Sequence, residues 1–175
     1  MNHAEHYQLK LAFIREMRNP HQGQAPYGAP FLVVGPGSPK SWRKEVEKLA
    51  YYFRREMHYD FPPYTASEAE YSLDVLRDRV LIFTNHHTTE KWERVFYLIG
   101  AVGVRWRKWE DAPHGWSVAW VWFHPYERRK GHLTKAWPFL LEMFPKPHVE
   151  PPISDAMKRF LLKVGYYDSL IDYEI

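Results

Sequence analysis

The sequence predicts a single domain of the α/β (α+β) class, in which a central mixed, mostly antiparallel sheet is flanked by helices. Two observations carry this prediction: β-branched and aromatic runs that read as strands, and a segment with strict helical periodicity. The chain has 175 residues, which suits one domain. It is 45% hydrophobic and 17% aromatic, so it has the apolar side chains for a core that a disordered chain lacks.

Residues 1–30 are expected to form an N-terminal arm, because they are rich in Asn, His, Gln, Gly and Pro. The apolar patch Leu9 to Met17 inside this arm is expected to be one helix, followed by a loop. Phe31 to Val34 then predict a short strand, which Gly35-Pro36-Gly37 ends.

Ser38-Pro39 opens the clearest helix. Its apolar side chains recur every three or four residues, which places them on one face: Trp42, Val46, Leu49, Ala50, Phe53 and Met57. Pro39 suits the first turn, where its missing N–H is no loss. The helix is expected to end before Pro62-Pro63.

Three strands are expected next, at residues 79–84, 95–106 and 116–123. A turn at residues 110–115 makes the last two an antiparallel hairpin. Gly100 and Gly103 inside the second strand indicate a bulge or a close approach of backbones.

Two helices are expected after the strands. The first runs from about Gly131 to Met143, and Pro138 either kinks it or marks its true start. The second is expected over residues 154–163, with Ser154 as N-cap and Gly165 just past its end.

The composition excludes several function classes. Without cysteine the chain has no disulfide scaffold, thiol nucleophile or Cys-based zinc site. The polar N-terminus and the lack of a long apolar run predict a cytoplasmic protein with no membrane partner. A net charge of only +3 suits an anionic ligand such as a coenzyme, and nucleic acid is not the expected partner.

The segment from Trp120 to Thr134 carries the predicted chemistry. It reads as an apolar strand, a basic loop with a glycine, and the start of a helix. Amides at a helix N-terminus point outward, and the helix dipole favours negative charge there. With Arg128, Arg129 and Lys130 beside them, these amides suit a pyrophosphate.

This segment resembles motif A of the GNAT acetyltransferases, whose pattern is Arg or Gln, two residues, Gly, one residue, and Gly or Ala. Arg128 and Gly131 match the first two defined positions, and Leu133 stands where the pattern has a small residue. The strand that runs into His124-Pro125 is also similar to the family's pattern.

A narrower resemblance is to the cohesin acetyltransferase branch of the same superfamily. Trp120-Val121-Trp122, Arg128-Arg129-Lys130 and Glu150-Pro151-Pro152 occupy similar places there. The chain lacks that branch's Cys-containing zinc finger, so a role on cohesin is not inferred. The resemblance covers roughly residues 92–165.

The resemblance implies an acetyl-CoA cofactor and an enzyme that transfers its acyl group to an amine. The strand backbone would pair with the pantetheine arm, the loop would hold the pyrophosphate, and the thioester would lie where the strand separates from its neighbour. The implied cofactor-binding residues are Val121, Trp122, Phe123, Arg128, Arg129, Lys130, Gly131, His132 and Leu133.

The amine must lose a proton before it attacks, and Glu150 and His124 are the candidate catalytic groups. Glu150 takes the place of the branch's functional Asp, and the alternative is a surface carboxylate beside a proline turn. His124 could relay a proton, or it could be a structural His bonded to a carbonyl. His86-His87 is not expected to bind a metal, because neighbours on a strand point oppositely.

The acceptor stays open between a protein or peptide amine, which we favour weakly, and a small amine such as a polyamine or an aminoglycoside. The third alternative is a module that binds acyl-CoA or nucleic acid without turnover. Arg105, Arg107 and Trp109 share one strand face, which favours a surface facing the substrate, or a solvated face, over a nucleic-acid platform.

Overall fold

The computed structural model describes residues 13–15, 25–67, 78–88, 94–110, 113–168 and 171, with the backbone alone at 13–15, 86–88 and 94–95. Six strands, three α-helices and one 3-10 turn lie in this part of the chain. In chain order they are β1 (Phe13–Arg15), β2 (Leu32–Val34), α2 (Lys40–Met57), β3 (Arg79–Thr88), β4 (Arg94–Arg107), β5 (Gly115–Phe123), η3 (Pro125–Glu127), α3 (His132–Met143), β6 (His148–Val149) and α4 (Asp155–Lys163).

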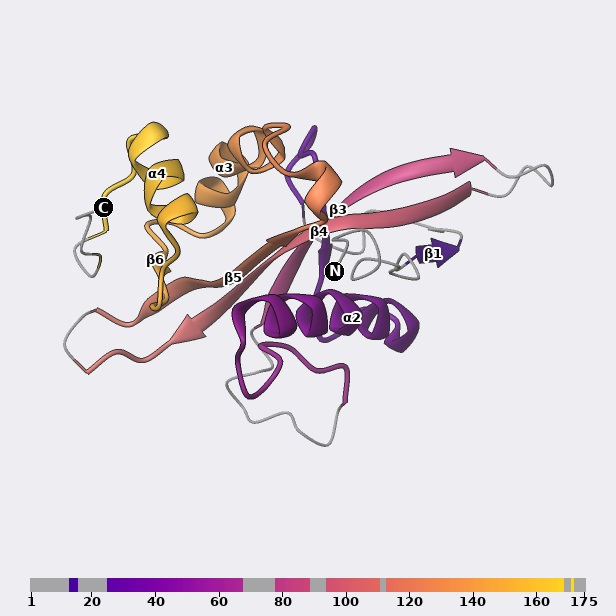
Figure 1. Cartoon of the computed structure of the whole chain (residues 1–175), viewed down its shortest axis with the longest axis horizontal. Helices are drawn as coiled ribbons and strands as arrows, with labels where there is room; N and C mark the ends of the chain where they lie inside the picture. Colours follow the sequence, from indigo (N-terminus) through magenta and orange to yellow (C-terminus); the bar gives the residue numbers. More distant parts are fainter. Residues whose placement is uncertain are drawn as a thin grey trace, which may run out of the picture.

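The strands form one mixed sheet, which confirms the predicted fold class. Its order is β2-β3-β4-β5-β6. β1 pairs with residues 95–97 of β4, just beyond the C-terminal end of β5, which pairs with Gly100. Every pairing is antiparallel except that of β5 with β6, which is parallel. Figure 1 shows α2 on one face of the sheet and α3 with α4 on the other.

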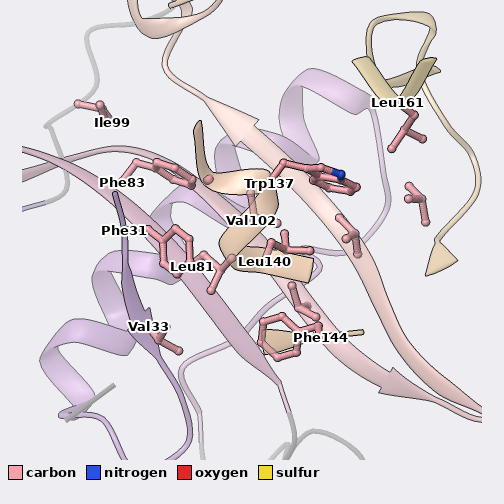
Figure 2. Packing of buried hydrophobic residues seen from close by; sticks show 14 of the residues in the cluster. Phe31, Val33, Leu81, Phe83, Ile99, Val102, Trp137, Leu140, Phe144 and Leu161 are labelled. Atoms are coloured by element: carbon pink, nitrogen blue, oxygen red, sulfur yellow. The ribbon is translucent and has the colours of Figure 1, made fainter. Parts of the chain in front are cut away.

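Alternation along the strands supplies a separate apolar core to each face. Val34, Val80 and Ile82 pack with α2, together with Trp120 and Trp122 of β5. The opposite core holds side chains of β2 to β5 against α3 and α4, as Figure 2 shows for Val33, Leu81, Phe83, Val102, Trp137, Leu140 and Leu161. The central part of the sheet is therefore buried on both faces.

The helix ends follow the sequence signals. α2 begins directly after Pro39 and ends at the left-handed His58, before Pro62 as predicted. The Ser154 side chain accepts a hydrogen bond from the Met157 amide at the start of α4, and Gly165 is left-handed just past its end. Pro138 lies inside α3, which starts at His132, so Pro138 does not mark the helix start.

Three sequence expectations need correction. Residues 13–15 were expected to be helical but form strand β1 against residues 95–97, because pairing with β4 overrides their local preference. The rest of Leu9 to Met17 lies outside the described residues. β3 runs on to Thr88 through residues whose polar pattern gave no strand signal. β6 was not predicted, since two residues carry no readable period.

Gly100 and Gly103 mark both a close approach and an irregularity, as their positions predicted. A Cβ on Gly103 would lie 2.0 Å from Nε1 of Trp120, and one on Gly100 would lie 2.2 Å from the Phe123 ring. The register of β4 and β5 shifts just beyond Gly103, where Ala119 is the extra residue on β5. The two glycines thus let aromatic rings of β5 lie close against the β4 backbone.

None of the described helices has the length and apolar character needed to cross a membrane.

Replacing Gly103 by Ala is expected to destabilise the protein by about 1–3 kcal/mol, because the new methyl group overlaps the buried Trp120 indole. Chemical denaturation measures this. Gly37→Ala is the matched control, since a Cβ there meets nothing within 4 Å. Equal stabilities of the two variants would contradict the account of the close approach.

Candidate functional site

Strands β5 and β6 run together only briefly and then separate. Ser117 pairs with His148 and Val118 with Val149, and the Glu150 amide donates to the Val118 carbonyl at 3.0 Å. Pro151 and Pro152 follow, and proline has no N–H to continue a ladder. The parallel pair therefore opens directly after Glu150.

A cavity of about 520 Å³ lies where the two strands separate. One wall is residues 118–121 of β5, and the other is residues 149–154 together with Met157 of α4. The C-terminal end of α2 and the following residues 58–61 close a third side. A volume of this size suits a small molecule or the reactive end of a larger one.

The outer edge of β5 beyond the cavity has no strand partner among the described residues. The His124 amide donates to the Ile99 carbonyl on β4, and groups along a strand face its two sides alternately. Trp122 therefore directs its backbone groups to β4, whereas those of Val121 and Phe123 face the open edge. This edge runs from the cavity to the loop that precedes α3.

The loop from His124 to Gly131 ends in a cluster of outward-facing amides. Gly131, the N-cap of α3, has φ +79, and a Cβ there would meet nothing within 4 Å. In the described residues no backbone carbonyl accepts from the amides of residues 129–134, and the next amide, of Lys135, donates to Gly131. These amides and the helix dipole can hold an anion.

The cations of this loop are not equivalent. The Arg128 guanidinium donates to the Phe123 carbonyl at 2.9 Å and to Glu56 of α2 at 2.6 Å. Lys130 and His132 both contact Glu127. Burial raises the pKa of the Glu127 carboxyl, but hydrogen bonds from these two partners outweigh it and lower the pKa. Arg129, exposed and without a polar partner in the described residues, is the cation left for a ligand.

Glu150 is held by two arginines and a serine at the edge of the cavity. Arg105 and Arg107 each donate two hydrogen bonds to its carboxylate, and Ser117 donates another at 2.5 Å. Burial raises its pKa, but the hydrogen bonds and charges of the arginines outweigh it and bring the pKa to about 2. So weak a base, with its oxygens occupied, does not fit the expected role of proton acceptor.

His124 caps the η3 turn rather than facing the cavity. Its Nδ1 accepts from the Tyr126 amide at 3.3 Å, and its ring stacks on Tyr126. Burial and the nearby Arg128 and Lys130 lower its pKa, against the effect of Glu127. His124 lies five positions beyond Ala119, a distance of roughly 16 Å along the extended chain. This environment favours the alternative of a structural histidine.

Sequence reasoning missed the groups that hold the site together. Glu56 accepts hydrogen bonds from both Arg128 and the Trp122 indole, so it ties the loop to α2. Ser117 is fully buried against Glu150. Neither residue belongs to a local pattern. The side chains that they contact lie 33 to 72 residues away along the chain.

The residues that the structure describes contain no group of three or more His, Cys, Asp or Glu that could hold a metal ion. The side chains of His86 and His87 lie outside that description.

No protein-family model matches the chain, and no curated protein matches it. Among solved structures it is similar to the tetramutant of the BH1408 protein from Bacillus halodurans, with 12% sequence identity and a TM-score of 0.49. The match covers 82% of this chain and 98% of that one. These comparisons assign no function to the chain.

Replacing Glu150 by Gln is expected to lower the free energy of unfolding by about 3 kcal/mol at pH 7, because two guanidinium groups lose their counter-charge. The folded-state pKa of about 2 lies below the ordinary 4.5, so the carboxylate stabilises the protein above pH 4.5. This contribution fades as the pH falls through about 2. Denaturation at a series of pH values should show the two stabilities converging in acid, and a pH-independent difference would contradict this role.

Proposed function

We propose that the chain is an acetyl-CoA-dependent N-acetyltransferase of the GNAT superfamily, which moves an acetyl group to a primary amine of a protein or peptide. One observation carries the proposal. The edge of β5 that opens beside β6 leads from a cavity at one end to an amide-rich loop and helix N-terminus at the other.

The spacing along this edge suits an extended thioester cofactor. From Ala119 at the cavity to Phe123 the strand rises roughly 13 Å, at about 3.3 Å per residue. A pantetheine arm can lie along it as an added strand and bond to the outward groups of Val121. Its pyrophosphate then meets the amides of residues 129–134 and the Arg129 side chain.

The bulge at Ala119 supports a place for the reacting carbonyl. Ala119 lines the cavity and has no Cα partner on β4 in the described register. A main-chain amide released from a ladder can donate to a carbonyl oxygen and stabilise the negative charge that develops on it. The thioester carbon is then open to attack from the cavity.

The far wall of the cavity suits an acceptor amine. The C-terminal end of α2, with the negative end of its dipole, and the exposed carboxylate of Asp60 both line this wall. Either attracts an ammonium group. The exposed Phe61 beside them extends this wall to the surface, where a peptide chain can lie against it.

The decisive experiment combines binding and turnover. Calorimetry should show acetyl-CoA bound at one site, and mass spectrometry of the purified protein should detect CoA or acetyl-CoA. Release of CoA is then followed with lysine peptides, polyamines and aminoglycosides. Turnover of the peptides supports the proposal. Turnover of the small amines alone would show that the acceptor is a small molecule. Tight binding of acetyl-CoA without any turnover favours a binding module.

Replacing Arg129 by Ala is expected to weaken acetyl-CoA binding by about 1.5–3 kcal/mol, the worth of a charge-assisted contact. Calorimetry measures the change. Arg159→Ala is the matched control, because Arg159 is an exposed cation on α4 away from the loop. Arg128→Ala should weaken binding less, because the Arg128 guanidinium already donates to Glu56 and to the Phe123 carbonyl. Unchanged acetyl-CoA affinity in Arg129→Ala would show that Arg129 does not contact the cofactor.

Replacing Gly131 by Ala is expected to reduce acetyl-CoA affinity at least tenfold, since the new methyl group occupies the open space in front of the loop amides. Gly165→Ala is a close control. Both glycines are left-handed and face open space, so both variants carry similar backbone strain, on the order of 1–2 kcal/mol. Equal loss of affinity in the two variants would mean that strain, not blocked access, is responsible.

A further inference from the structure

Asp78, directly before β3, has a place beside the cavity that no local sequence pattern indicates. Arg79 pairs with Val104 on β4, which brings Asp78 opposite Arg105. Val80, two residues further on, is buried on the α2 side of the sheet, so Asp78 lies on that side too. The cavity opens on the same side.

A small void joins Asp78 to the bulge of β5. It measures about 10 Å³, and Asp78, Ala119 and Trp120 are among the residues that line it. Ala119, Trp120 and Arg105 also line the main cavity. A void of this size is about what one water molecule needs, and the charged residues among its lining, Asp78, Arg79 and Arg105, can supply hydrogen-bond partners. One water would thus link the carboxyl of Asp78 to the cavity.

The charges around Asp78 set it apart from Glu150. Burial raises the pKa of the Asp78 carboxyl to about 6. The guanidiniums of Arg105, Arg107 and Arg79 oppose this rise, and the Glu150 carboxylate adds to it. Asp78 is therefore ionised at neutral pH but holds a proton far more strongly than Glu150, which is what a base acting near pH 7 requires.

We propose that Asp78, through a water in this void, takes the proton from the acceptor amine; the inference rests on the acetyltransferase function proposed above. The ammonium gives one proton to the water, which passes one on to the Asp78 carboxylate. The amine nitrogen then attacks the thioester carbon, the C–N bond forms and the C–S bond breaks. The second nitrogen proton goes to the departing thiolate, and Asp78 releases its proton to solvent.

The test is the pH profile of acetyl transfer in Asp78→Asn, with the acceptor that the panel shows to be turned over fastest. The parent protein should gain activity as the pH rises through about 6. In Asp78→Asn the turnover number should fall by about 10²–10⁴-fold and this rise should disappear. Affinity for acetyl-CoA should stay unchanged in calorimetry.

Two further variants separate the proton role from structural effects. Glu142→Gln makes the same chemical change at an exposed carboxylate of α3 and should leave the profile unchanged. Asp78→Glu keeps a carboxyl group and should retain the rise near neutral pH. If Asp78→Asn fails to fold, carbon NMR of the parent's Asp78 carboxyl decides, because a midpoint below pH 5 would overturn the assignment.

The outcomes separate this inference from the function on which it rests. Acetyl-CoA binding and transfer with a normal profile in Asp78→Asn would overturn the role of Asp78 and leave the acetyltransferase standing. A protein that binds no acetyl-CoA, or transfers to no amine, would overturn both.

Discussion

Two guanidinium groups and a hydroxyl meet at the Glu150 carboxylate, and this contact fixes where β6 leaves β5. Arg105 and Arg107 extend from β4 and Ser117 from β5, so three strands are tied at one point. The carboxylate is well buried, so an unpaired charge there would be costly. The separation of β5 from β6, and the cavity between them, depend on the hydrogen bonds that Arg105, Arg107 and Ser117 make to Glu150.

The two apolar cores keep the sheet stable although β5 and β6 separate after a short pairing. β4 is paired along most of both edges, whereas β3 pairs with β4 along its whole length and with β2 only at residues 80–82. The central parts of both strands are buried on both faces. The parallel pair of β5 and β6 can therefore be short, because α3 and α4 hold the chain after β5 against the sheet through their own core. An unpaired strand edge normally invites association with another chain. In the proposed function, this edge is the surface along which the extended cofactor binds.

Cations in the loop before α3 serve two different purposes. Arg128 and Lys130 are paired with Glu56 and Glu127, and these contacts hold the loop in shape. Such pairs contribute little to stability at a surface, but they position the backbone. The proposed pyrophosphate site therefore depends mainly on the loop amides and on Arg129. A residue's charge alone therefore does not indicate whether it faces a ligand.

The sequence by itself determined most of the elements, because periodicity, caps and glycines are local signals; it did not predict β1 or β6, which depend on pairing with β4 and β5. It predicted α2, α4, the β4–β5 hairpin and the close approach at Gly103, and it located the loop at Arg128 to Gly131. Only the tertiary structure decided what the charged groups do. Glu150 was expected to be a base from its place in the chain, but Arg105 and Arg107, more than forty residues away, occupy its oxygens and lower its pKa, so it is a poor proton acceptor. Asp78 gained its environment in the same way, since burial and the charge of neighbours are properties of packing. A side chain's chemistry is set by what surrounds it, and the sequence does not state those surroundings.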